Sequence, residues 1–247
     1  MSPVLDIQCG PLVRYVQTDY SSPDAPVALY TVMIVANDVK SDYASRPRLQ
    51  VAGINTDTDD GQVTTLTAIA FHKERGFTFW RWNVELTLIQ QERRLAYTIN
   101  GSREDLGFWV PAANQPMRIM FYSCNGNYYF YTFPDISGFS QSVHPEDLSG
   151  PDPLWSDVLR QHKSCPWHVM LGGGDQIYND GLAKKSKLFK AWLQISNLHH
   201  KFNTPYTKEL ADEIEEFYLF HYCEVGSLLH SIIANFTVVP PRPLQPR

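Results

Sequence analysis

Large apolar and polar residues alternate from Thr78 to Leu88. The apolar positions are Trp80, Trp82, Val84, Leu86 and Leu88, and the residues between them are Arg81, Asn83, Glu85 and Thr87. A period of two places the apolar side chains on one face, which predicts a β-strand with that face against a core.

The first half of the chain carries further strand patterns. Val27 to Ala36 is apolar on both faces, as in a buried strand, and Thr64 to His72 and Arg94 to Asn100 resemble the alternating strand. Polar turns are predicted at Thr56 to Gly61 and at Asn100-Gly101. Several short strands joined by polar turns predict a β-sandwich domain over residues 1–113.

The character of the chain changes after Pro111 to Pro116, a segment that we expect to be a linker. Met117 to Tyr122 has the composition of a buried strand, and a second strand is expected at His168 to Leu171. A helix is expected between them, with Asp152 as its cap and Pro153 in its first turn. Its apolar stripe consists of Leu154, Trp155, Val158 and Leu159. Strand, helix and strand form the unit of a parallel sheet with a right-handed connection.

Two more helices are predicted after this unit, near Lys185 to Phe202 and Thr207 to Asn235. In the second, Leu210, Ile214, Phe217 and His221 fall on one face. The chain is therefore expected to be an α+β protein of two domains, the second over residues 117–236, followed by a proline-rich tail at 237–247.

The run from His168 to Asp180 carries the strongest chemical signal, because three glycines end a strand just before oxygen-bearing side chains. Ligands of parallel sheets bind beyond the carboxyl ends of the strands, where glycine lets the backbone turn sharply. The Ser123 to Gly126 turn is expected at the same edge. We predict one wall of a metal site there, in which oxygen donors suit hard or ferric cations and a thiolate adds a softer donor. The candidate ligands are Cys124, Asp175, Tyr178 and Asp180.

Each of these residues also has a purely structural interpretation. Asp175 could cap the following turn while the glycines relieve crowding and Tyr178 packs, and Cys124 could be a small buried hydrophobe. His168 is expected in the core or at a strand edge, and His199-His200 late in a helix. The lysines at 184, 185, 187 and 190 are expected on a solvated face, with phosphate binding as the alternative.

Composition limits the possible functions. A net charge of −5 argues against a general nucleic-acid binder. The four cysteines form no Cys-x-x-Cys pair, which argues against a zinc knuckle and favours free thiols. Met1 to Gly10 lacks the pattern of a secretory signal, and Phe217 to Phe236 is interrupted by polar residues. A cytoplasmic protein with no membrane span is the expectation.

Several segments in order resemble the PhoD-like (alkaline phosphatase D-type) metallophosphatases, in particular the fungal proteins with a PhoD-like domain. The glycine-aspartate-tyrosine run from His168 to Asp180 is the most specific of them, and the similarity extends from about Cys9 to Cys223. The other segments begin at Cys9 (Cys-Gly-Pro-Leu), Phe79 (Phe-Trp-Arg-Trp-Asn-Val), Phe108 (Phe-Trp-Val-Pro), Met120 (Met-Phe-Tyr-Ser-Cys-Asn-Gly) and Gly150 (Gly-Pro-Asp-Pro-Leu-Trp).

The resemblance implies an N-terminal β-sandwich followed by a calcineurin-like phosphoesterase domain that hydrolyses phosphate esters with a cluster of metals. It implies iron and calcium as the metals, Cys124 and Asp175 as ligands, and Tyr178 as a phenolate ligand to iron. Asp180 lies within the same motif.

Two departures from the family weaken the prediction of activity. An aromatic stretch from Asn127 to Gly138 follows the Ser-Cys-Asn-Gly turn, and the family's downstream Asp-Asp-His-Asp run does not occur. We therefore expect an incomplete site with weak or no hydrolysis. The alternative function is a β-sandwich binding module, suggested by the aromatic strand around Trp80 and Trp82.

Overall fold

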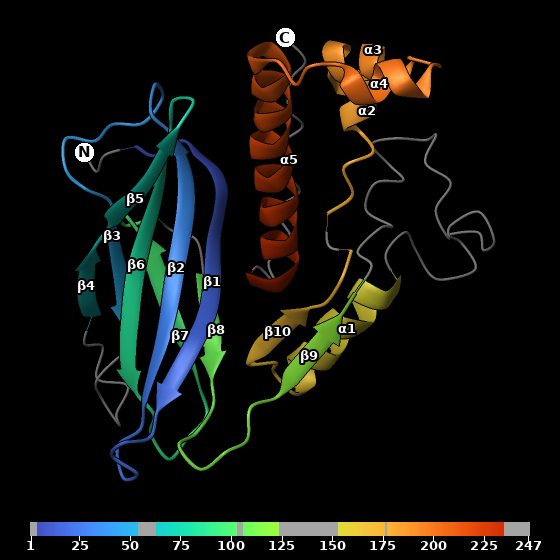
Figure 1. Cartoon of the computed structure of the whole chain (residues 1–247). Coiled ribbons are helices and arrows are strands. Elements are labelled where there is room, and N and C mark those ends of the chain that lie inside the picture. The colour runs from blue at the N-terminus through green and yellow to red at the C-terminus, as the bar shows by residue number, and fades with distance from the viewer. Residues whose placement is uncertain (1–3, 54–62, 103–105, 124–152, 176, 235–247) are drawn as a thin grey trace.

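The computed structural model describes residues 4–53, 63–102, 106–123, 153–175 and 177–234 (Figure 1). The strands in these ranges are β1 (Ile7–Asp19), β2 (Val27–Asn37), β3 (Arg48–Ala52), β4 (Val63–Thr67), β5 (Ile69–Glu74), β6 (Phe77–Thr87), β7 (Arg93–Ile99), β8 (Leu106–Val110), β9 (Ile119–Tyr122) and β10 (Val169–Gly172). The helices are α1 (Pro153–Ser164), α2 (Leu182–Lys185), α3 (Lys187–Leu193), α4 (Leu198–Asn203) and α5 (Lys208–Ala234).

Two antiparallel four-stranded sheets make up the N-terminal half, as the strand patterns predicted. Their strand orders are β1-β2-β6-β5 and β4-β3-β7-β8. One hydrophobic core joins the facing sides of the two sheets, with Tyr30 and Trp82 from the first and Leu49 and Tyr97 from the second among its largest buried side chains. Burial of such side chains stabilises the fold by about 1.5–3 kcal/mol each.

The alternating segment forms β6, and its apolar face lies in this core. Trp80 is 6% exposed and Trp82 is 1% exposed. The indole rings are therefore core residues and form no binding surface. β2 and β7 also match their predicted ranges, and the predicted Asn100-Gly101 turn is present with left-handed φ angles of 51° and 73°.

The segment Thr64 to His72 is not one strand, contrary to the prediction. β4 belongs to one sheet and β5 to the other, and the buried Ala68 lies between them. The Ala68 N–H donates to the carbonyl of Pro47 at 2.9 Å, where the chain crosses between the sheets. A strand that changes sheets keeps its extended backbone, so the alternation in the sequence does not mark the corner.

The single helix predicted at Lys185 to Phe202 is also wrong, because α2, α3 and α4 replace it. The Ser186 side chain accepts from the Phe189 N–H and the Asn197 side chain from the His200 N–H, so each begins a new helix. His199 and His200 consequently lie in the short helix α4, with His200 in its last turn.

β9 and β10 are parallel, with α1 between them in the chain, which confirms the strand-helix-strand unit. Pro153 begins α1 as predicted. The expectation that the first of these strands is buried is wrong, since Phe121 of β9 is 66% exposed, and Leu171, its neighbour on β10, is 53% exposed. The opposite side is covered, where Tyr122 packs on Trp155 of α1 at 5.3 Å between ring centroids. The composition of a buried strand thus occurs in β9, although one of its faces is exposed.

α5 lies along the outer face of the first sheet (Figure 1). Leu219 and Cys223 of the helix pack against Cys9, Val35 and Phe77. The helix face predicted from periodicity is confirmed, because Phe217 and His221 are buried. In the described part of the chain no helix combines the length and hydropathy that a membrane span requires. The domain limits and the proline-rich tail stay predictions. The turn predicted at Thr56 to Gly61 and the helix cap predicted at Asp152 lie outside the described residues.

We predict that Gly10→Ala destabilises the protein more than Gly101→Ala. Both glycines have positive φ, at 91° and 73°, so alanine is strained at either position by about 1 kcal/mol. At Gly10 a Cβ would also lie 2.5 Å from the Met33 carbonyl oxygen, whereas at Gly101 nothing lies within 4 Å. The free energy of unfolding from urea titration measures both. Equal losses would show that the strand pair opens at Gly10 without cost.

Candidate functional site

The carboxyl ends of β9 and β10 meet at one edge of the two-stranded sheet, since the strands are parallel. Ser123 follows β9, and Gly173, Gly174 and Asp175 follow β10. The Ser123 hydroxyl donates to the Gly174 carbonyl at 2.9 Å, and the Gly173 N–H donates to the Tyr122 carbonyl at 2.7 Å. These bonds hold the glycine turn against Tyr122 and Ser123.

Glycine at position 173 avoids crowding against the side chains of Phe121 and Ser123. A Cβ there would lie 2.7 Å from Cζ of Phe121 and 3.2 Å from the Ser123 hydroxyl oxygen. A Cβ at this position would therefore force the Phe121 and Ser123 side chains to move. Relief of crowding, the predicted structural role of the glycines, thus applies at Gly173.

Asp175 has a left-handed backbone with φ of 54°. Aspartate tolerates this conformation better than most residues, although the strain costs on the order of 1 kcal/mol. The Tyr178 hydroxyl donates to Oδ2 of Asp175 at 3.5 Å, a long hydrogen bond. The carboxylate and the phenol, which are three positions apart in the chain, thus face one another.

Helix α5 bonds the backbone at Tyr178. Nε2 of His221 donates to the Tyr178 carbonyl at 2.7 Å, because the carbonyl can only accept. The His221 ring is buried and stacks on Phe217 at 5.0 Å between centroids. The backbone that carries Tyr178 is therefore positioned by a helix whose start is 30 residues further along the chain.

The structure brings two of the four predicted ligands together, Asp175 and Tyr178. Asp180 is exposed in the turn before α2. Cys124 and the neighbouring Asn125 lie outside the described residues.

Carboxylate and phenolate oxygens fit a hard or ferric cation in type. The number of these oxygens is too small for such a cation. Within the described ranges no group of three or more His, Cys, Asp and Glu side chains could hold a metal ion.

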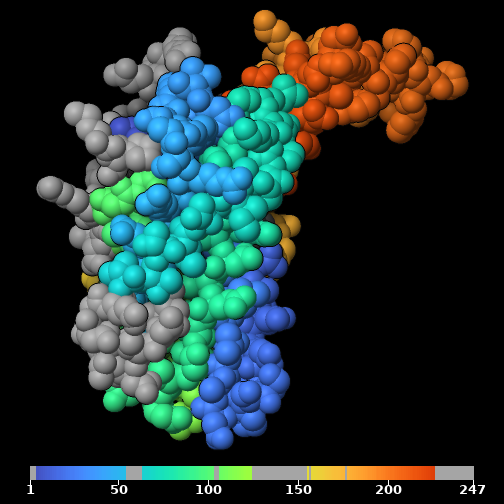
Figure 2. All heavy atoms as spheres, turned by 90° about the vertical axis from the view of Figure 1, so that its left-hand side faces the viewer, coloured from blue at the N-terminus to red at the C-terminus, as the bar shows by residue number. Residues whose placement is uncertain are grey.

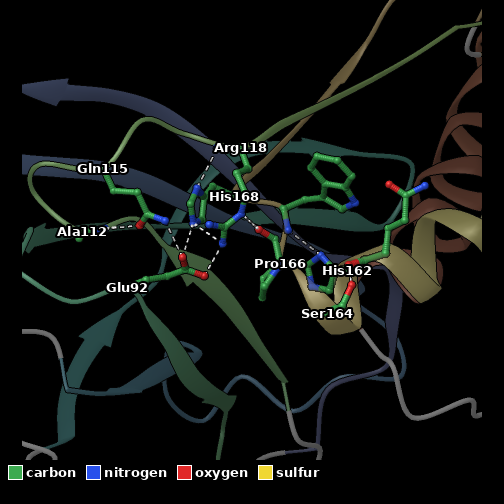
Figure 3. A network of polar contacts seen from close by, with 10 residues as sticks. Glu92, Ala112, Gln115, Arg118, His162, Ser164, Pro166 and His168 are labelled. Atoms are coloured by element: carbon green, nitrogen blue, oxygen red, sulfur yellow. Dashed lines mark hydrogen bonds and ion pairs between the residues drawn. The ribbon is translucent and has the colours of Figure 1, made fainter.

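A polar network that the sequence analysis missed lies at the opposite ends of β9 and β10 (Figure 3). Arg118 makes an ion pair with Glu92, which precedes β7, and its Nε donates to the Pro166 carbonyl at 2.6 Å. Nε2 of Gln115 donates to Glu92 at 2.7 Å, and its Oε1 accepts from the Ala112 N–H. The predicted linker is thus a hydrogen-bonded corner that joins the strand pair to the N-terminal sheets.

His168 lies at the centre of this network, with a side chain that is 0% exposed. Its Nδ1 accepts from the Arg118 N–H at 3.0 Å, so the neutral ring carries its hydrogen on Nε2. That nitrogen lies 3.7 Å from Oε2 of Glu92. The 3.2 Å contact between Nε2 and the Arg118 guanidinium then joins two N–H groups and is not a hydrogen bond. The prediction that His168 lies in the core or at a strand edge is confirmed, since the residue is buried.

Burial and the Arg118 charge lower the pKa of His168, and Glu92 opposes them only in part. Burial also lowers the pKa of His162, whose Nδ1 accepts from the Trp167 N–H. The hydrogen bond from Arg118 lowers the pKa of the Glu92 carboxyl. No local pattern could have revealed the network, because Glu92 and His168 are 26 and 50 residues from Arg118.

We predict that acidification destabilises the protein through His168. Its pKa in the folded protein is lowered from 6.5, so the unfolded chain binds more protons. The contribution of neutral His168 to the stability of the folded protein is complete above pH about 6.5. It is lost as the pH falls through the lower pKa that His168 has in the folded protein. The free energy of unfolding, from urea titration between pH 7.5 and 5.5, measures this loss. The range extends about a unit to each side of the pKa of histidine in the unfolded chain and lies above the range in which Glu92 titrates.

The matched variant is His168→Asn, whose amide oxygen can accept from the Arg118 N–H at any pH. The fall in stability with pH should become smaller, and a part should persist because His162 shifts in the same direction. An unchanged pH dependence in this variant would exclude His168 as its source.

Comparison with known proteins agrees with the resemblance in the sequence. Residues 125–238 match the family of PhoD-related phosphatases, and this range continues beyond Cys223, where we expected the similarity to stop. An uncharacterised protein of Saccharomyces cerevisiae, YGR266W, is 31% identical over 228 residues, which cover 89% of this chain. The chain spans 30% of the length of that relative. No solved structure is significantly similar. Over residues 125–238 the chain is similar to the PhoD-related phosphatases.

Proposed function

We propose that the chain supplies one wall of a metal-dependent phosphoesterase site of the PhoD type, within part of a calcineurin-like domain. The main support is the position of Asp175 and Tyr178, which face each other at the carboxyl edge of two parallel strands inside the range that matches the family. The substrate class that follows from the family is a phosphate monoester or diester.

The proposed ligands are Asp175 and Tyr178, with Cys124 and Asp180 as further candidates. Iron and calcium are the metals that the family resemblance implies. A bound cation of this kind polarises a phosphoryl oxygen and lowers the pKa of a water molecule that it binds.

The remaining groups act by positioning. The Ser123 hydroxyl and the Tyr122 carbonyl hold the glycine turn against β9. His221 holds the Tyr178 backbone, so the phenol stays near the Asp175 carboxylate.

We further propose that this chain by itself has weak or no hydrolytic activity. Calcium takes about six to eight oxygen ligands, whereas the described residues bring two oxygen-bearing side chains together. The sequence contains no Asp-Asp-His-Asp run that could supply the rest. The binding-module alternative has lost its support, since Trp80 and Trp82 are core residues.

We expect the purified 247-residue chain to bind less than one equivalent of iron and to hydrolyse aryl phosphate monoesters and diesters near the background rate. Asp175→Ala should lower the iron content further. Tyr178→Phe should abolish any visible absorption from an iron–phenolate bond while it leaves the ring packing intact. Elemental analysis, absorption spectra and product release measure the three quantities.

Asp24→Asn serves as the matched control, because this carboxylate is exposed in the turn between β1 and β2. Full metal occupancy with turnover that Asp175→Ala abolishes would contradict the proposed incompleteness. Metal content that neither Asp175→Ala nor Tyr178→Phe changes would exclude this turn as the site.

A further inference from the structure

Residues 181–206, which include α2, α3 and α4, form a basic lobe at one end of the molecule. In Figure 1 these helices lie beyond the sheets, and in Figure 2 they project from the body. The lobe contains no aspartate or glutamate although the whole chain has a net charge of −5. Its five lysines are Lys184, Lys185, Lys187, Lys190 and Lys201.

The same lobe exposes large apolar side chains. Leu198 is 67% exposed, Phe202 is 81% exposed and Tyr206 is 68% exposed. Leu198 and Phe202 are four residues apart on α4 and therefore share one side of that helix. Leu188 and Leu193 of α3 are also among the exposed apolar residues.

This exposure does not come from a poorly organised segment. Oε2 of Glu213 on α5 accepts from the Ser186 hydroxyl at 2.6 Å and from the Leu188 N–H at 3.2 Å, which anchors α3. The Trp192 indole donates to the Lys201 carbonyl at 3.1 Å, which joins α3 to α4. The lobe is a defined structure that presents cationic and apolar groups together.

We propose that the basic lobe binds the surface of anionic lipid bilayers. Leucine and phenylalanine side chains would enter the headgroup region, while the lysine ammonium groups meet lipid phosphates and carboxylates. Lysine is a hydrated point charge on a flexible stem, which suits a fluid layer of headgroups better than a rigid pattern of carboxylates on a protein. This binding is independent of the proposed phosphoesterase site and requires no metal.

The test is co-sedimentation of the full chain with vesicles of phosphatidylcholine, with and without phosphatidylserine. We expect binding only to the vesicles with phosphatidylserine, and weaker binding as salt screens the charges. The double variant Lys187→Gln/Lys190→Gln should weaken binding about tenfold or more, since each lysine near an anionic surface contributes roughly fivefold. Lys201 is unsuitable for this test because its ammonium group packs on the Trp192 ring at 4.6 Å.

The apolar contribution is tested with Leu198→Ser/Phe202→Ser, which should also weaken binding. The matched controls are Lys73→Gln/Lys163→Gln and Val39→Ser, because these residues are exposed outside the lobe and should leave binding unchanged. Circular dichroism and thermal unfolding verify that each variant folds.

Equal binding to vesicles of phosphatidylcholine alone would overturn the proposal, as would binding that neither lobe variant weakens. The protein could instead bind soluble polyglutamate as tightly as it binds the anionic vesicles, with no effect of Leu198→Ser/Phe202→Ser. This result would overturn the proposal and show that the lobe recognises acidic polypeptides.

Discussion

The ion pair between Arg118 and Glu92 joins the two halves of this protein. Both side chains are partly shielded from water, at 23% and 21% exposure, so the pair is screened less than a surface salt bridge. The same guanidinium also bonds the Pro166 carbonyl before β10. One arginine therefore sets where both parallel strands begin relative to the antiparallel sheets.

The other end of the strand pair depends on steric fit. Gly173 lets the β10 turn pass against Phe121, and the bonds from Ser123 and to Tyr122 hold it there. Because β9 and β10 are short and in register, an error at their beginning would shift the turn that carries Asp175. The polar network and the candidate site are thus two ends of one small unit, with α5 closing it from the side through His221.

Much of the fold follows from local pattern. β2, β6, β7, α1 and α5 occur where alternation or helical periodicity predicted them, because each buries one face on a core. The corner at Ala68 and the division of Lys185 to Phe202 into three helices were missed. The backbone stays extended through the corner at Ala68, so the alternation does not reveal it. In the segment from Lys185 to Phe202 the composition suits one helix, but the side chains of Ser186 and Asn197 cap new helices.

The sequence by itself determined the resemblance to the PhoD-like proteins, the order of strand, helix and strand, and the residue types at the candidate site. Only the tertiary structure decided that Tyr178 faces Asp175, that His168 is a buried acceptor in an ion-pair network, and that the lysine-rich segment projects with exposed leucines. Periodicity reports which face of an element is covered. Contacts between residues tens of positions apart depend on how the elements pack, and no local pattern encodes that packing.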